Sequence, residues 1–184
     1  QRESAWTWEH MALTRARPVA GSAIAREATA AIVAEVLGRP RDDTALTADA
    51  VAMRREIATH KPPLGELDVK LVPGGLVDLE FTVELLQLRH RTALTPSLDT
   101  ALAVLVDQNR LPAALPGAHG LLTRMLVALR LVTPERDDLP DESRDIVARA
   151  CGHADWPSLL AAYGAARQTV SRSWRQVAAI EEDW

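Results

Sequence analysis

Several features that define whole classes of protein are scarce or missing from this sequence of 184 residues. The single cysteine, Cys151, excludes an internal disulfide framework, and its apolar neighbours Ile146 and Val147 predict a buried thiol. No window approaches the ~20 consecutive apolar residues that a membrane span requires. The N-terminal residues also lack the apolar core of a signal peptide. We therefore expect a cytoplasmic protein that does not associate with membranes.

Aromatic residues and positive charge are also in short supply. Aromatics make up 4% of a sequence that is 47% hydrophobic, so Leu, Val and Ala must build the core, which favours helices. The formal net charge is -4 at pH 7. Because binding to phosphate backbones needs a basic face, this balance argues against a general role on nucleic acids or on membrane surfaces.

Signatures of metal binding and of catalysis are missing as well. The five histidines, at positions 10, 60, 90, 119 and 153, show neither the HExxH spacing nor cysteine partners. The sequence has no nucleophile elbow, no Walker phosphate loop and no dinucleotide fingerprint. From the residues alone we expect a helical domain with no metal site and no catalytic residue of its own.

The most regular stretch of the chain lies between Lys70 and Arg91. The helix breaker Pro73 is followed by Gly74 and Gly75, which are free to adopt a positive φ. After them the apolar positions recur at helical spacing in two adjacent stripes, Leu76, Leu79, Val83, Leu86 and Val77, Phe81, Leu85, Leu88. Two stripes predict a helix at about 76–90 that is buried over much of its circumference and around which the other helices pack.

Two carboxylates, Asp78 and Glu80, begin this helix and allow two interpretations. In the first they complement the positive end of the helix dipole and face water, as acidic residues at helix starts commonly do. In the second the Gly-Gly turn brings both carboxylates to a fixed place where they serve a neighbouring active site. Spacing alone does not decide between these interpretations.

The rest of the chain predicts further helices and almost no strand, that is, an all-α bundle of six to seven helices. Ser22 caps a helix to Leu37 whose inward residues are Ile24, Ala28, Ala31, Ile32 and Leu37. Residues 67–72 read as a short extended lead-in to the central helix, and 133–140 as a mobile polar loop. The remaining helices are expected at about 4–17, 47–60, 97–109, 119–132, 142–151 and 157–177, with Ser4 and Thr47 as N-caps of the first two of these.

Arg15 lies seven residues after Trp8, so both share one face of the first expected helix. An arginine beside an aromatic ring suits binding of an anion or stacking on a base. A surface arginine that merely packs over tryptophan explains the same spacing, and both interpretations stay open.

Two long motifs, AWTWEHMALTRARPVAG at Ala5–Gly21 and KLVPGGLVDLEFTVELLQLRHR at Lys70–Arg91, resemble signatures of a known family. It is the bifunctional glutamine synthetase adenylyltransferase/deadenylase family. VAMRREI at Val51–Ile57 and SRSW at Ser171–Trp174 are similar to that family too, so the resemblance extends over nearly the whole chain.

The resemblance implies a parent enzyme with two nucleotidyltransferase domains, each followed by a helical bundle. One half attaches AMP to a tyrosine of glutamine synthetase, and the other removes it by phosphorolysis, under control of glutamine and the PII signalling protein. Leu76–Phe81 is more similar to the adenylylating, C-terminal half. On this basis residues 1–20 are expected to be the last helix of a truncated nucleotidyltransferase domain, and 21–184 its helical bundle domain.

One departure from the family pattern limits what the chain can do alone. The family's transferase centre needs a Gly-Ser followed by two aspartates one residue apart, and a third aspartate on a later strand, all of which bind magnesium; that combination is not present here. Magnesium and ATP are therefore implied for the full-length enzyme only, and no catalytic or metal-binding residue is expected in this chain. The resemblance implies candidates for the nucleotide site or the domain border: Glu9, Arg15, Arg17, Gly74, Gly75, Asp78 and Glu80.

The implied partners are glutamine synthetase, the PII signalling protein and the upstream nucleotidyltransferase domain of the same chain. A freestanding helical adaptor for protein interactions, without nucleotide chemistry, is the alternative. A helical hydrolase of the His-Asp metal type is disfavoured because the sequence contains no adjacent His-Asp pair.

Overall fold

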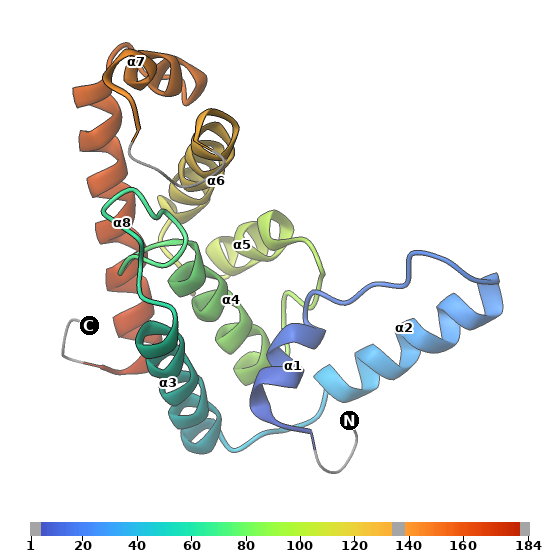
Figure 1. Cartoon of the computed structure of the whole chain (residues 1–184). Coiled ribbons are helices and arrows are strands. Elements are labelled where there is room, and N and C mark those ends of the chain that lie inside the picture. The colour runs from blue at the N-terminus through green and yellow to red at the C-terminus, as the bar shows by residue number, and fades with distance from the viewer. Residues whose placement is uncertain (1–4, 134–138, 181–184) are drawn as a thin grey trace. The chain divides into compact units, whose positions relative to one another are not determined.

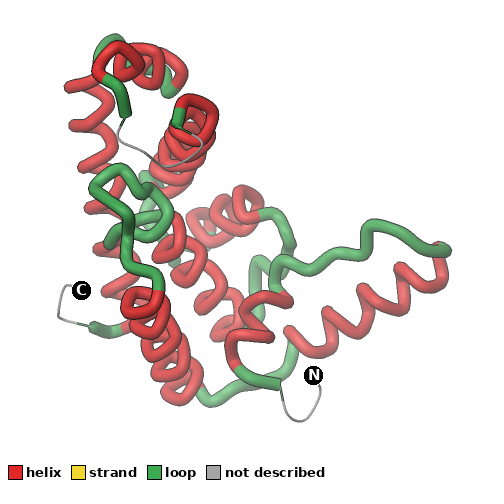
Figure 2. Tube along the Cα trace, in the orientation of Figure 1, coloured by secondary structure: helices red, strands yellow, loops and turns green. Residues whose placement is uncertain are grey.

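The structure, a computed structural model, describes residues 5–133 and 139–180, and over these ranges its regular secondary structure consists of helices joined by loops, with no strand (Figure 2). The prediction of an all-α fold is confirmed, although the described part contains one helix more than the six to seven expected. The described part holds eight helices: α1 (Thr7–Leu13), α2 (Ala23–Leu37), α3 (Asp43–His60), α4 (Leu76–His90), α5 (Leu98–Asp107), α6 (Leu115–Val132), α7 (Asp141–Ala150) and α8 (Trp156–Ala178).

The chain divides into two compact units, each of which contains two separate segments of the sequence. The first unit comprises Gln1–Glu56 and Glu80–Leu111, and the second comprises Ile57–Leu79 and Pro112–Trp184. The domain boundary predicted at residue 20 concerns the parent protein and stays a prediction.

In the second unit, α6, α7 and α8 pack against one another (Figure 1). Asp155 caps α8 by accepting a 2.8 Å hydrogen bond from the backbone N–H of Ser158, and Pro157 follows in the first turn. Apolar side chains from all three helices are fully buried, among them Met125, Val147 and Trp174. Burial of this kind stabilises a core by about 1.5–3 kcal/mol for each large apolar side chain.

In the first unit, α1 contacts α2, and polar bonds join α3 to the end of α4. Arg89 forms an ion pair with Asp43 and donates a 2.7 Å hydrogen bond to the hydroxyl of Thr47. The Gln87 amide donates a 2.6 Å bond to the carbonyl of Ala93, in the turn that ends α4. These contacts hold the C-terminal part of α4 against the start of α3.

The central helix predicted at about 76–90 is present as α4. It is buried over most of its length, as its two apolar stripes predicted. Every residue from Leu76 to Leu88 is buried except Glu80, and Leu79 and Leu85 are completely inaccessible to solvent. The position of this helix and its burial were both predictable from its periodicity.

The second helix differs from its prediction in burial but not in position. Ser22 accepts a hydrogen bond from Ala25 N–H and Gly38 ends the helix, as expected. The inward face assigned to Ile24, Ala28, Ala31 and Ile32 is wrong, because all four are exposed; Ile24 keeps 80% of its surface accessible. Only the end of α2, at Val36 and Leu37, is buried.

The extended segment predicted at 67–72 is also wrong, because it is a series of turns. Asp68 explains the difference: its carboxylate accepts hydrogen bonds from the backbone N–H groups of Leu64, Lys70 and Leu71. Side chains of Asp commonly hold the backbone in such turns, in competition with regular structure. Apolar alternation alone did not reveal this competition.

Two helices, α3 and α6, begin four residues earlier than predicted. α3 begins at Asp43 rather than Thr47, with Asp42 accepting a 2.7 Å bond from Ala45 N–H. α6 begins at Leu115 rather than His119, because Pro116 is tolerated in a first turn. The cap predicted at Ser4 and the polar loop over 134–138 lie outside the described residues.

Candidate functional site

The turn before α4 requires glycine at two successive positions for two different reasons. Gly74 has φ +75°, and a Cβ there would stand 2.2 Å from the backbone oxygen of Arg167. At Gly75 a Cβ would meet three carbonyl oxygens, the nearest, that of Val69, at 2.7 Å. The Pro-Gly-Gly turn (Pro73–Gly75) is therefore fixed by contact with its surroundings, and no larger side chain fits.

Asp78 faces this turn and not the solvent. It is 1% exposed, and its Oδ2 accepts a 2.6 Å hydrogen bond from the backbone N–H of Gly74. The interpretation in which Asp78 faces water is thus wrong, because the side chain is buried. The carboxylate instead satisfies a donor of the Pro-Gly-Gly turn, a charge-assisted bond that fixes the turn to the first turn of α4.

α8 supports the same turn from the other side. Arg167 donates from Nε to the carbonyl oxygen of Pro73 at 3.0 Å, and its guanidinium lies over the ring of Tyr163 at 5.4 Å. Tyr163 donates its hydroxyl proton to the carbonyl of Glu66 at 2.9 Å, and its burial raises its pKa to about 12. The tyrosine therefore stays protonated at physiological pH and remains a donor to the loop that precedes the turn.

A separate cluster of charges in the first unit contains Arg15, Glu80 and Glu84. The guanidinium of Arg15 lies 3.1 Å from a carboxylate oxygen of Glu80 and 3.9 Å from one of Glu84. Burial, with a smaller contribution from the negative charge of Glu80, raises the pKa of Glu84 to about 8, although Arg15 partly opposes both effects. Glu84 is consequently largely protonated at neutral pH, and Arg15 pairs with Glu80.

The remaining border candidates have simpler surroundings. Glu9 accepts a 2.8 Å hydrogen bond from the backbone N–H of Trp6 and so caps α1. Arg17 is exposed, beyond the end of α1. Because α1 ends at Leu13, Arg15 lies beyond the helix and does not share with Trp8 the helix face that their spacing predicted.

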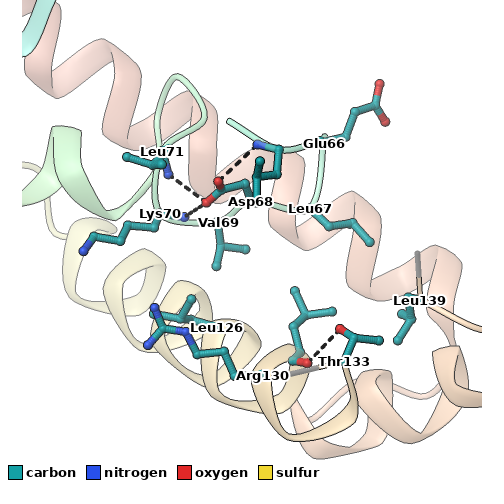
Figure 3. A pocket seen from close by; sticks show the side chains of 13 residues that line it. Glu66, Leu67, Asp68, Val69, Lys70, Leu71, Leu126, Arg130, Thr133 and Leu139 are labelled. Carbon is teal, nitrogen blue, oxygen red and sulfur yellow. Dashed lines mark hydrogen bonds between the residues drawn. The ribbon is translucent and has the colours of Figure 1, made fainter. Parts of the chain in front are cut away.

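A cavity of about 170 Å³ lies between the loop 64–71 and the C-terminal end of α6 (Figure 3). Leucine is the most frequent residue in its described wall, and Lys70, Arg130 and Thr133 are among the polar residues that line it. In Figure 3 the carboxylate of Asp68 turns toward the backbone of its own loop, where it holds the turns described above. The Asp68 carboxylate therefore stabilises the loop that forms one wall of the cavity.

Over residues 5–133 and 139–180, no three His, Cys, Asp or Glu side chains come together as a metal site would require. Among the helices in those ranges, none combines the length and hydropathy needed to cross a bilayer. The structure thus defines a class: an all-α domain with a rigid Pro-Gly-Gly turn and a buried carboxylate, and without metal ligands in its described part.

Comparison with known proteins narrows this class. The family model described as GlnD PII-uridylyltransferase matches residues 47–178, and the chain belongs to this family. Three relatives are named bifunctional glutamine synthetase adenylyltransferase/adenylyl-removing enzyme. The one from Brucella suis is 37% identical over 84% of this chain and 17% of its own length. The one from a Bradyrhizobium species is 33% identical over 100% of this chain and 19% of its own length. The one from Xanthobacter autotrophicus is 41% identical over 67% of this chain and 13% of its own length. The chain thus spans less than a fifth of the length of each of these relatives. These matches confirm the family resemblance that was predicted from the two long motifs.

Sequence reasoning found some of these positions and missed others. Gly74, Gly75 and Asp78 are brought together in the second unit, and Arg15 and Glu80 in the first. Glu84 and Arg167 were not singled out. Glu84 follows Glu80 by one helical turn and stands between the apolar residues Val83 and Leu85, a pattern that signals a partly buried carboxyl. No local signal links Arg167 to Pro73, because that contact joins distant parts of the sequence.

Proposed function

We propose that this chain is a helical region of an enzyme that transfers AMP from ATP to a tyrosine of glutamine synthetase. In the same parent enzyme the other half would remove AMP by phosphorolysis. The observation that carries the proposal is the similarity to bifunctional adenylyltransferases over most of the chain. The parent enzyme would act in the cytoplasm and control nitrogen assimilation.

The region would regulate and support catalysis without performing it. The sequence lacks a Gly-Ser followed by two aspartates one residue apart, as in the transferase centre, and two-metal phosphoryl chemistry needs such carboxylates. ATP and magnesium would therefore bind the upstream nucleotidyltransferase domain. Glutamine synthetase, the PII protein and that upstream domain are the proposed partners.

The two groups of site residues would have different roles at the border with the catalytic domain. Gly74, Gly75 and Asp78 form a rigid turn, which suits a structural support for a neighbouring site. Arg15 is held by Glu80 but is half exposed, and Arg17 is exposed, so both can reach a nucleotide or its phosphates. Glu9 would order the helix that precedes them.

The purified chain should not transfer labelled AMP from ATP to glutamine synthetase in the presence of magnesium. Helical circular dichroism would show that the chain tested is folded, and full-length enzyme would serve as the positive control. Detectable incorporation of label by the chain alone would contradict the proposal.

The role of Asp78 is tested in full-length enzyme by Asp78→Ala. Loss of the bond to Gly74 should lower the rate of AMP transfer at least tenfold or abolish its response to glutamine. Glu142→Ala is the matched control, because Glu142 is an exposed acidic residue in the first turn of another helix, α7. Unchanged transfer and unchanged glutamine response in Asp78→Ala would leave this carboxylate with a structural role only.

A freestanding helical adaptor is the second candidate, and the exposed apolar surface of α2 favours it. Ile24 and Ile32 remain 80% and 48% exposed, and Trp6 near the start of α1 is 72% exposed. The genomic reading frame separates the candidates: an upstream segment with the aspartate set supports the transferase, and its absence supports the adaptor. Calorimetric titration of the chain with glutamine and with PII protein would then identify the effector.

A further inference from the structure

The longest helix of the described chain, α8, has an unusual charge composition. Its 23 residues include three arginines and no aspartate or glutamate, although acidic residues outnumber basic ones in the whole sequence, 25 to 21. Helical arginines are commonly balanced by carboxylates three or four residues away, and α8 offers no such partner.

The arginines share one face of α8, the long red helix in Figure 1. Positions 164, 167, 168, 171, 172 and 175 follow the spacing that places residues on a single helical face. These residues and Pro73 line an open groove of about 510 Å³, which we call the α8 groove. Its described lining contains no carboxylate and no aromatic ring.

Two guanidinium groups in the α8 groove are oriented by bonds to the backbone. Arg167 donates from Nε to Pro73 O at 3.0 Å, and Arg172 donates from Nε to Gln168 O at 3.2 Å. Each bond uses one of five donors and fixes the plane of the group. The terminal amino groups of Arg172 make no hydrogen bond with any described residue and remain as donors.

Oriented arginines of this kind match a particular ligand chemistry. The planar fork of an arginine binds phosphate oxygens through two parallel hydrogen bonds. Arg167 and Arg175 are eight residues apart, which at 1.5 Å per residue is about 12 Å along the helix. That distance exceeds the width of one phosphate group, and the groove volume falls within the range of small-molecule sites.

We propose that the α8 groove binds a phosphorylated small molecule that carries at least two phosphoryl groups. Because no aromatic ring lines the described groove, recognition is of the phosphates and not of a base, so ATP and tripolyphosphate bind with similar affinity. The ligand contacts Arg167, which also holds the Pro-Gly-Gly turn. This site does not depend on the transferase assignment.

The test is calorimetric titration of the 184-residue chain with sodium tripolyphosphate and with ATP at low salt. Saturable binding is expected, weakened by added salt, together with shifts of the Nε–Hε resonances of Arg167 and Arg172 in nitrogen-15 spectra. Arg172→Gln should weaken binding at least fivefold. Arg149→Gln is the matched control, an exposed arginine on α7 outside the groove, and should change the affinity less than twofold.

A second variant keeps the proposal testable if Arg172→Gln perturbs the helix. A Cβ at Gly164 would meet nothing within 4 Å, so Gly164→Glu fits without strain and places a carboxylate one turn before Arg167. It should weaken tripolyphosphate binding at least tenfold while helical circular dichroism is retained. Absence of saturable binding, or unchanged affinity in both variants, overturns the proposal. So does tighter binding of a glutamate-rich peptide to the same arginines, which would assign the groove to an acidic protein surface.

Discussion

Glu84 shows how strongly a single residue can depend on its surroundings. It is 7% exposed within the apolar helix α4, and the structure provides Arg15 as the nearby cation at 3.9 Å, already engaged with Glu80. Burial therefore dominates, and the carboxyl takes a proton that an exposed glutamate would have lost.

This protonation predicts a dependence of stability on pH. The folded pKa of about 8 lies above the ordinary value of 4.5, so between these values the native state binds more protons than the unfolded state. The stabilising contribution is complete below pH 4.5 and is lost as the pH rises through 8. In Glu84→Gln the free energy of unfolding should lack this loss, which in the wild type is about 1.4 kcal/mol per pH unit within the window.

Urea denaturation at pH 5, 6, 7 and 8 measures the difference between the two slopes. Glu142→Gln, which changes an exposed carboxyl, should retain the slope of the wild type. Identical slopes in the wild type and Glu84→Gln would show that Glu84 titrates normally.

Gly74 is the residue where the backbone tolerates least change. Gly74→Ala introduces a Cβ at a positive φ and 2.2 Å from Arg167 O, so the turn must move away from α8. We expect a loss of about 2–4 kcal/mol in the free energy of unfolding, the range of strained and overpacked sites. Chemical denaturation of the purified variant measures this loss; a change below about 0.5 kcal/mol, the level of a surface substitution, would contradict it.

At the scale of elements, α8 contains a glycine with the opposite behaviour. Gly164 lies within the helix, and a Cβ there meets nothing within 4 Å. Gly164→Ala should therefore stabilise the chain by about 0.5–1 kcal/mol, because alanine loses less backbone entropy in a helix. Thermal denaturation by circular dichroism would record a higher midpoint, and a lower midpoint would refute the prediction.

α2 and α4 differ in burial although both were read as inward-facing helices. Periodicity identifies where a helix can form and which face is apolar, and it did so for both. It does not say whether a partner covers that face, and in α2 no residue before Val36 is buried. α3 and α6 likewise begin earlier than predicted, because Asp42 caps the start of α3 and Pro116 is accommodated in the first turn of α6.

The exposed surface of α2 predicts rapid local opening. Native-state hydrogen exchange should give its central amides an opening free energy at least ~2 kcal/mol below that of the α4 amides. The buried residues of α4 provide the internal reference in the same spectra. Equal protection of both helices would mean that α2 is stabilised by contacts beyond those described.

At the scale of the whole molecule, the family could be read from the sequence while the site could not. The Pro-Gly-Gly motif predicted a turn. The sequence does not explain why each position must be glycine, because a Cβ at Gly74 would clash with the distant Arg167 and one at Gly75 with the carbonyl of Val69 in the preceding loop. Asp78 was recognised as unusual, yet spacing alone left its burial undecided. Contacts between distant segments determine both, and no local pattern encodes them.

The expectation that this chain holds no metal site predicts that magnesium does not stabilise it. No cluster of three metal-ligating side chains exists in the described part, whereas a site saturated at 100 times its Kd would add about 2.7 kcal/mol of stability. Melting temperatures with and without millimolar magnesium should therefore agree within one degree, at constant ionic strength. A clear rise would reveal a site in the chain itself.

The single cysteine has a practical consequence. Cys151 is 2% exposed, and burial raises its pKa, so both access and thiolate formation are suppressed while the fold is intact. A thiol-reactive dye would then label the chain only when the region around α7 opens. The rate of labelling would therefore measure that opening without an engineered probe. A cysteine introduced at the surface would be labelled selectively, because Cys151 does not react while the fold is intact.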